Sequence, residues 1–133
     1  MSENRRTVLV VEDDPPLRRM IGIFLRAAGY RVCAAEDGLS GLALAQDERP
    51  DLVLLDLMMP GLDGWEVLRR IKGDARTAAI PVLVLTASVD PPLTEQALRL
   101  GATRFLAKPI DSRVLVEIVD DVLGQTEGRK ERP

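Results

Sequence analysis

The sequence predicts an α/β domain in which a parallel five-stranded sheet lies between two layers of helices. Short runs rich in leucine and β-branched residues alternate with segments in which apolar residues recur at helical spacing. Several of the short runs are apolar at consecutive positions, as in strands that are covered on both faces. A chain of 133 residues with 46% hydrophobic and 29% charged residues suits one such domain.

The strands and helices are expected to follow one another in five β-then-α units. The five expected strands are residues 8–11, 31–35, 52–55, 82–86 and 103–107. A helical pattern follows each strand, at residues 17–28, 39–43, 67–71, 93–100 and 114–123. Because each strand connects to the next through a helix, the sheet should be parallel and doubly wound.

Capping signals mark the ends of the expected helices. Aspartates stand before four helix starts, at Asp14, Asp63, Asp90 and Asp111. Glycines stand where helices should end, at Gly29, Gly73, Gly101 and Gly124. We expect one domain over residues 7–124, with disordered tails at 1–6 and 125–133.

Composition excludes several classes of function. The net charge of −3 argues against a general nucleic-acid-binding surface. The apolar runs are far too short to span a bilayer, and no secretory segment follows the start, so we expect a cytoplasmic protein. The chain has no histidine and one cysteine, Cys33, which excludes a Ser-His-Asp triad, an internal disulfide and a phosphohistidine. Cys33 itself is expected to be a buried, small apolar residue.

Polar residues follow the expected strands where each strand ends. Glu12 and Asp13 follow the first strand, and Asp56 follows the third. Thr86 ends the fourth strand and Lys108 follows the fifth. Ligands of open parallel sheets bind outside the carboxyl ends of the strands, at the point where the strand order reverses. The second strand contributes little there, which favours the order 2-1-3-4-5 with that strand at the sheet edge.

These strand-end residues suit phosphoryl chemistry. Two carboxylates about 4 Å apart repel by about 4 kcal/mol at an effective dielectric constant of about 20, so the acidic group favours a divalent cation. All candidate ligands are oxygens, which suits Mg²⁺. Lys108 adds a positive charge and Thr86 a hydroxyl donor. Asp56 is the best candidate nucleophile because it ends the central strand alone.

The sequence resembles the receiver domains of bacterial response regulators over residues 7–124. Four motifs in order carry the resemblance: residues 10–14 (VVEDD), 56–64 (DLMMPGLDG), 86–87 (TA) and 108–109 (KP). The resemblance implies a flavodoxin-like (βα)5 fold with Mg²⁺ as cofactor. It implies that Asp56 is the phosphoacceptor and a metal ligand, with Asp13 as the direct metal carboxylate. Glu12 would act through water, and the Met58 backbone carbonyl would complete the protein ligands.

The resemblance also implies a switch. Lys108 would pair with a phosphoryl oxygen, and its bond to Pro109 would be a cis peptide. Thr86 would move to bond the phosphoryl group, and Phe105 would rotate inward at a position commonly held by tyrosine. Since phenylalanine has no hydroxyl, only the packing part of that role carries over.

The function expected from the resemblance is that of a phosphorylation switch. A sensor histidine kinase or histidine phosphotransfer protein would donate the phosphoryl group to Asp56. The surface of the fourth helix, fifth strand and fifth helix would then bind a downstream protein target, and it is also a candidate for homodimer formation. We expect a stand-alone receiver that contacts neither membrane nor nucleic acid directly and catalyses only its own phosphorylation and slow dephosphorylation.

Other interpretations remain open for single residues and for the whole chain. Asp14 is expected to cap a helix, Trp65 to pack, and Arg18 to lie on a solvated helix face. A phosphatase using Asp56 as nucleophile is an alternative, although Met58 occupies the position of its usual second aspartate. A scaffold with an inactive pocket is another alternative. A nucleotide- or flavin-binding module is disfavoured because no glycine-rich phosphate loop follows the first strand.

Overall fold

A computed structural model of the chain describes residues 5–59 and 63–124 and contains the five predicted β-then-α units. The strands are β1 (Thr7–Val11), β2 (Arg31–Ala35), β3 (Leu52–Asp56), β4 (Val82–Thr86) and β5 (Arg104–Ala107). The helices are α1 (Pro15–Ala27), α2 (Gly38–Glu48), α3 (Gly64–Gly73), α4 (Pro91–Arg99) and α5 (Ser112–Val122).

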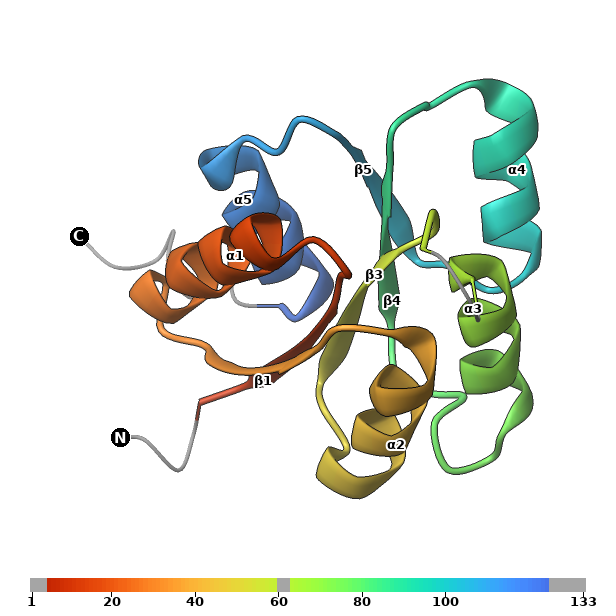
Figure 1. Ribbon diagram of the computed structural model, residues 1–133, viewed down its shortest axis with the longest axis horizontal. Coiled ribbons are helices and arrows are strands. Elements are labelled where there is room, and N and C mark those ends of the chain that lie inside the picture. Colours follow the sequence, from red (N-terminus) through yellow and green to blue (C-terminus); the bar gives the residue numbers. More distant parts are fainter. Residues whose placement is uncertain (1–4, 60–62, 125–133) are drawn as a thin grey trace.

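The five strands form one parallel sheet in the order β2-β1-β3-β4-β5, which confirms the predicted topology. Helices α1 and α5 cover one face of the sheet, and α2, α3 and α4 cover the other (Figure 1). The central strands β3 and β4 are buried along their whole length. Val11 pairs with both Ala35 and Leu55, so β1, β2 and β3 end at nearly the same level.

Each face of the sheet has its own core. Alternate residues of β1 and β3 point to opposite faces because side chains alternate along a strand. Leu9, Val11 and Leu55 pack under α2, α3 and α4. Val8 and Leu54 pack under α1 and α5. The consecutive apolar positions of the sequence therefore reflect burial on both faces, as predicted. Figure 1 shows these two helical layers on either side of the strands.

Most of the predicted capping signals act as expected. The carboxylates of Asp14, Asp63 and Asp111 accept hydrogen bonds from backbone N–H groups in the first turns of α1, α3 and α5. Asp90 precedes α4, but its side chain makes no capping hydrogen bond. Gly73 is the last residue of α3, so this helix ends where the glycine signal predicts.

Some smaller expectations need adjustment. Asp56 is the last residue of β3, where the sequence pattern ended the strand at Leu55. Cys33 is only partly buried and packs at the border of the core beneath α2. Trp65 is partly buried and packs against the same core, as predicted. Within the described residues, no helix has the length and apolar character that a membrane crossing requires.

A buried polar contact joins the residue before β2 to α5. The hydroxyl of Tyr30, which is 2% exposed, donates a hydrogen bond to the carboxylate of Asp120, which is 5% exposed. The two residues lie 90 positions apart in the chain. This contact lies within the core between the sheet, α1 and α5, where a buried carboxylate is costly without donors.

Replacing Tyr30 with phenylalanine should destabilise the domain by about 1–3 kcal/mol, because the buried Asp120 carboxylate then loses a donor. Urea unfolding of the parent chain and Tyr30→Phe measures the difference. If the two chains unfolded with the same free energy, this contact would have no net value for stability.

Candidate functional site

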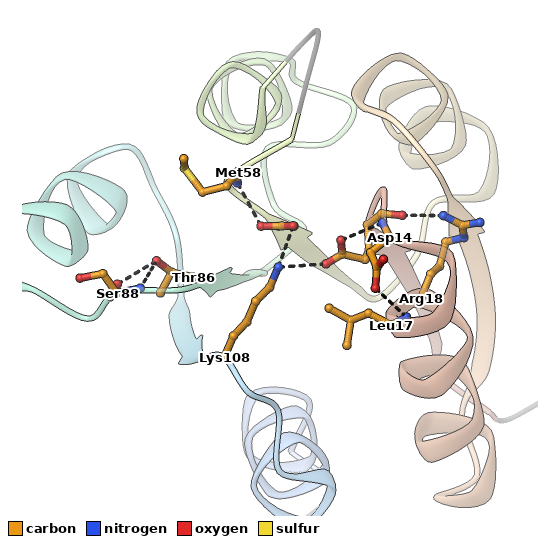
Figure 2. A network of polar contacts seen from close by, with 9 residues as sticks. Asp14, Leu17, Arg18, Met58, Thr86, Ser88 and Lys108 are labelled. Atoms are coloured by element: carbon orange, nitrogen blue, oxygen red, sulfur yellow. Dashed lines mark hydrogen bonds and ion pairs between the residues drawn. The ribbon is translucent and has the colours of Figure 1, made fainter.

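The residues predicted from the strand ends meet at the carboxyl edge of the sheet. Figure 2 shows Lys108 reaching from the end of β5 towards the end of β3, with the loop that carries Asp14 on the far side. Carboxylate oxygens of Glu12, Asp13 and Asp56 lie within 4.8 Å of one another. Glu12 and Asp56 are each 1% exposed, whereas Asp13 is partly exposed. The acidic cluster of Glu12, Asp13 and Asp56 is therefore mostly removed from water.

Lys108 joins the two buried carboxylates. Its Nζ donates a hydrogen bond to Asp56 Oδ2 at 2.9 Å and lies 3.5 Å from Glu12 Oε1. The other oxygen of Asp56, Oδ1, accepts a hydrogen bond from the Met58 backbone N–H at 3.0 Å. Glu12 Oε2 accepts one from the Asp14 backbone N–H at 3.1 Å. Among the described residues, Glu12 Oε1 is the buried side-chain oxygen that makes no hydrogen bond.

The burial and close approach of these charged groups shift the pKa values of Glu12 and Lys108. The pKa of Glu12 is raised from 4.5 to about 7, chiefly by burial and in part by the negative charge of Asp56. The Asp14 backbone N–H and the charge of Lys108 act in the opposite direction but do not outweigh burial. Burial lowers the pKa of Lys108, yet the hydrogen bond and charge of Asp56 outweigh it, so the net pKa of Lys108 is raised. Lys108 is therefore firmly charged near neutral pH.

The acidic cluster has the donor set that a hard divalent cation prefers. Its ligands are carboxylate oxygens, and one of them, Glu12 Oε1, is buried without a hydrogen bond. The Met58 backbone N–H contacts Asp56, while Met58 as a whole residue is 69% exposed. The part of the motif at residues 60–62 lies outside the described residues.

Thr86 faces its own loop. Its hydroxyl donates a hydrogen bond to the Ser88 carbonyl at 2.8 Å and accepts one from the Ser88 N–H at 3.1 Å, as Figure 2 shows. Phe105 is partly buried and, with Thr86 and Ala97, lines a small gap between β4, β5 and α4. The peptide bond between Lys108 and Pro109 is cis, which is the geometry that the resemblance implies.

Two residues beside the site were missed by the sequence analysis. Gly64 packs directly against the backbone after β3, where an added Cβ would lie 2.3 Å from the Asp56 carbonyl oxygen and 2.3 Å from Leu57 Cα. Arg18 was expected on a solvated face, but it is partly buried and its guanidinium donates to the Glu12 carbonyl. The sequence signal for Gly64 was its place at the end of the acidic motif, but that place was interpreted only as a helix start.

The family model of the response regulator receiver domain matches residues 8–120. The chain belongs to this family of receiver domains.

Relatives of this receiver domain differ in length. Protein PilH of Pseudomonas aeruginosa is 38% identical over 116 residues, which cover 87% of this chain and 96% of that protein. The phosphate regulon transcriptional regulatory protein PhoB of the same species is 40% identical over 121 residues, which cover 91% of this chain and 53% of that protein. The chain thus spans about half the length of PhoB and of other transcriptional regulators that it matches.

Solved structures of receiver domains have the same fold. The chemotaxis response regulator CheY4 of Vibrio cholerae superposes with a TM-score of 0.86 at 32% identity, covering 90% of this chain and 100% of that one. The receiver domain of the sensor histidine kinase PA1611 of Pseudomonas aeruginosa gives a TM-score of 0.83 at 32% identity, covering 90% of this chain and 98% of that one. The PA1611 structure has a magnesium ion coordinated in its active site cleft.

Gly64→Ala should destabilise the receiver domain by about 1–3 kcal/mol or more, because the new methyl group can be accommodated only if the backbone after Asp56 moves. Gly73→Ala is the matched control at the other end of α3, where an added Cβ meets nothing within 4 Å. Thermal or urea unfolding compares the two variants. If Gly64→Ala and Gly73→Ala had the same free energy of unfolding, the close packing around Gly64 would be contradicted.

In the absence of divalent cations, Glu12 should make stability depend on pH. The folded pKa of about 7 lies above the ordinary 4.5, so the contribution of Glu12 to stability is fully present below about pH 4.5. It is lost as the pH rises through 7, because the buried carboxyl must then ionise beside Asp56.

Glu12→Gln tests this dependence. The measurement is urea unfolding in the presence of EDTA. From pH 5 to pH 8, the free energy of unfolding of Glu12→Gln should rise relative to that of the parent chain by an amount on the order of 1–3 kcal/mol. A difference between the two chains that stays constant over this range would contradict the raised pKa of Glu12.

Proposed function

We propose that this receiver domain accepts a phosphoryl group on Asp56 in an Mg²⁺-dependent step. The observation that carries the proposal is the acidic cluster itself, in which a buried, central carboxylate faces a single lysine. A sensor histidine kinase or a histidine phosphotransfer protein would be the donor, since receiver domains of response regulators generally act with histidine kinases. The compartment would be the cytoplasm, where such kinases present their phosphohistidines.

Mg²⁺ would be held by oxygens of the acidic cluster. Asp13 and Asp56 supply carboxylates, the Met58 backbone carbonyl is the proposed third protein ligand, and Glu12 is proposed to act through water. This assignment is supported by the closeness of the three carboxylates and by Glu12 Oε1, which is buried without a hydrogen bond. When bound, the cation would neutralise oxygen charge on the transferring group.

In the transfer step, a carboxylate oxygen of Asp56 forms a bond to phosphorus as the bond between phosphorus and the donor imidazole nitrogen breaks. The product is an acyl phosphate on Asp56, and the electron pair of the broken bond returns to the imidazole. The Met58 N–H and Lys108 hold the two oxygens of the Asp56 carboxylate in the unphosphorylated state. Lys108 would then pair with a phosphoryl oxygen, because its ammonium is already directed at the acceptor.

The switch would run through Thr86 and Phe105. The new phosphoryl oxygens would draw the Thr86 hydroxyl away from Ser88, and Phe105 would rotate into the space beside Thr86. The rotation would repack the surface formed by α4, β5 and α5, which we propose binds a downstream protein and is a candidate for homodimer formation. Beyond its own phosphorylation and slow dephosphorylation, no further catalysis is proposed.

Asp56→Asn should abolish labelling by acetyl phosphate in the presence of Mg²⁺, because the amide is not a nucleophile for phosphoryl transfer. The matched control is Asp90→Asn, an exposed aspartate whose side chain caps no helix, which should label like the parent chain. Intact-mass spectrometry measures the added phosphoryl group with and without Mg²⁺. Labelling that persists in Asp56→Asn would overturn the assignment of the acceptor.

A further inference from the structure

Arg18 contacts the loop that carries two members of the acidic cluster. It lies in α1, is partly buried, and its Nη1 donates a hydrogen bond to the Glu12 backbone carbonyl at 2.8 Å. Figure 2 shows Arg18 reaching this loop from the side away from Lys108. The neighbouring Arg19 is exposed. Two adjacent arginines of the same helix therefore have different environments.

The carbonyl that Arg18 holds belongs to the peptide group between Glu12 and Asp13. That peptide plane sets the direction in which the chain leaves Glu12 and hence where the Asp13 carboxylate can lie. On its amino side, the Glu12 N–H donates to the Ala35 carbonyl of β2 at 3.1 Å. On its carboxyl side, the Arg18 backbone N–H donates to the Asp14 carbonyl at 2.9 Å. Arg18 therefore connects the loop to α1 through two hydrogen bonds, one from its side chain to the Glu12 carbonyl and one from its backbone to the Asp14 carbonyl.

The hydrogen bond from Arg18 opposes the electrostatic repulsion within this loop. Glu12 and Asp13 are consecutive acids that face a third acid, Asp56, and like charges at this separation repel. Repulsion would favour any rotation of the peptide that moves the Asp13 carboxylate away from Asp56. A hydrogen bond from a charged guanidinium to the peptide carbonyl opposes that rotation more strongly than a neutral donor would.

We propose that Arg18 is a positioning residue for the metal site: it fixes the peptide between Glu12 and Asp13 so that one cation contacts both Asp13 and Asp56. The inference rests on the proposed function, because it concerns the same Mg²⁺ site. Lys108 pairs with carboxylates of the cluster, whereas the Arg18 guanidinium binds a backbone carbonyl. Within the described part of the chain, Arg18 therefore supports the site without competing with the cation.

A positioning role and a simple charge effect predict opposite signs. If Arg18 acted only through its positive charge, its removal would lessen the repulsion of Mg²⁺ and tighten binding. If Arg18 positions the loop, its removal weakens binding, since outer partners of metal ligands affect affinity by about tenfold or more. The direction of the change therefore distinguishes the two roles.

The test compares Arg18→Met, which keeps an unbranched apolar stem but no donor, with Arg19→Met, which loses the same charge one residue away. Isothermal titration calorimetry with MgCl₂ should give about a tenfold weaker Kd for Arg18→Met and a Kd equal to or tighter than that of the parent for Arg19→Met. Arg18→Lys, which keeps the charge but replaces the guanidinium with one ammonium group, should have a Kd between those of the parent chain and Arg18→Met.

A second readout is phosphorylation by acetyl phosphate as a function of Mg²⁺ concentration. In Arg18→Met, the half-saturating concentration should rise about tenfold, while the labelling rate at saturating Mg²⁺ stays near that of the parent. Unfolding curves without metal establish that each variant is folded. If Arg18→Met does not fold, the test compares the Mg²⁺ Kd of Arg18→Lys with that of Arg19→Met. Arg18→Lys should then bind Mg²⁺ more weakly than Arg19→Met.

The outcomes separate this inference from the function on which it rests. Equal or tighter Mg²⁺ binding by both Arg18 variants would overturn the positioning role while leaving the metal site in place. A parent chain that binds no Mg²⁺ would overturn both. A parent chain that binds Mg²⁺ but takes up no phosphoryl group would contradict the proposed function alone, because the calorimetric comparison would still decide the role of Arg18.

Discussion

The structure depends on the pairing of one lysine with two buried carboxylates at the edge of the sheet. Lys108 contacts Asp56 and lies close to Glu12, and both acids are 1% exposed. One positive charge cannot neutralise two carboxylates and the adjacent Asp13. The surplus of negative charge is tolerable only where donors and a cation can approach, which is at the open carboxyl ends of the strands. This charge distribution suits the magnesium ion and the phosphoryl group of the proposed function.

The rest of the fold holds these charges together against their repulsion. The strands β1 and β3 deliver the acids, and their apolar residues pack on both faces of the sheet. At the rim, Gly64 lets α3 approach the backbone after Asp56, and Arg18 fastens the loop after Glu12 to α1. The other side of the site is held more loosely: Ala97 is the buried residue of α4, and Asp90 provides no side-chain cap. That difference suits the surface that is proposed to change on phosphorylation.

The sequence was sufficient for the strand order and for the meeting of Glu12, Asp13, Asp56 and Lys108 at one edge of the sheet, because both follow from local patterns. Polar residues directly after apolar runs identify strand ends, and a parallel sheet brings those ends together. The contacts that were missed depend on three-dimensional detail. The helical pattern of the sequence does not distinguish Arg18, whose side chain binds the Glu12 carbonyl, from its neighbour Arg19. Likewise, Tyr30 and Asp120 are too far apart in the chain for any pattern to pair them.

The direction of the Thr86 hydroxyl could not be predicted from sequence either, and it has a consequence for the switch. Two hydrogen bonds to Ser88 hold this hydroxyl in its own loop, so the proposed movement towards Asp56 would break both. The lost bonds are replaced only if a stronger acceptor stands at Asp56, which a phosphoryl group provides and a carboxylate already paired with Lys108 does not. In the proposed switch, Lys108 would therefore also help to keep the unphosphorylated domain in its resting arrangement, because its pairing with Asp56 leaves the Thr86 hydroxyl without a better partner than Ser88.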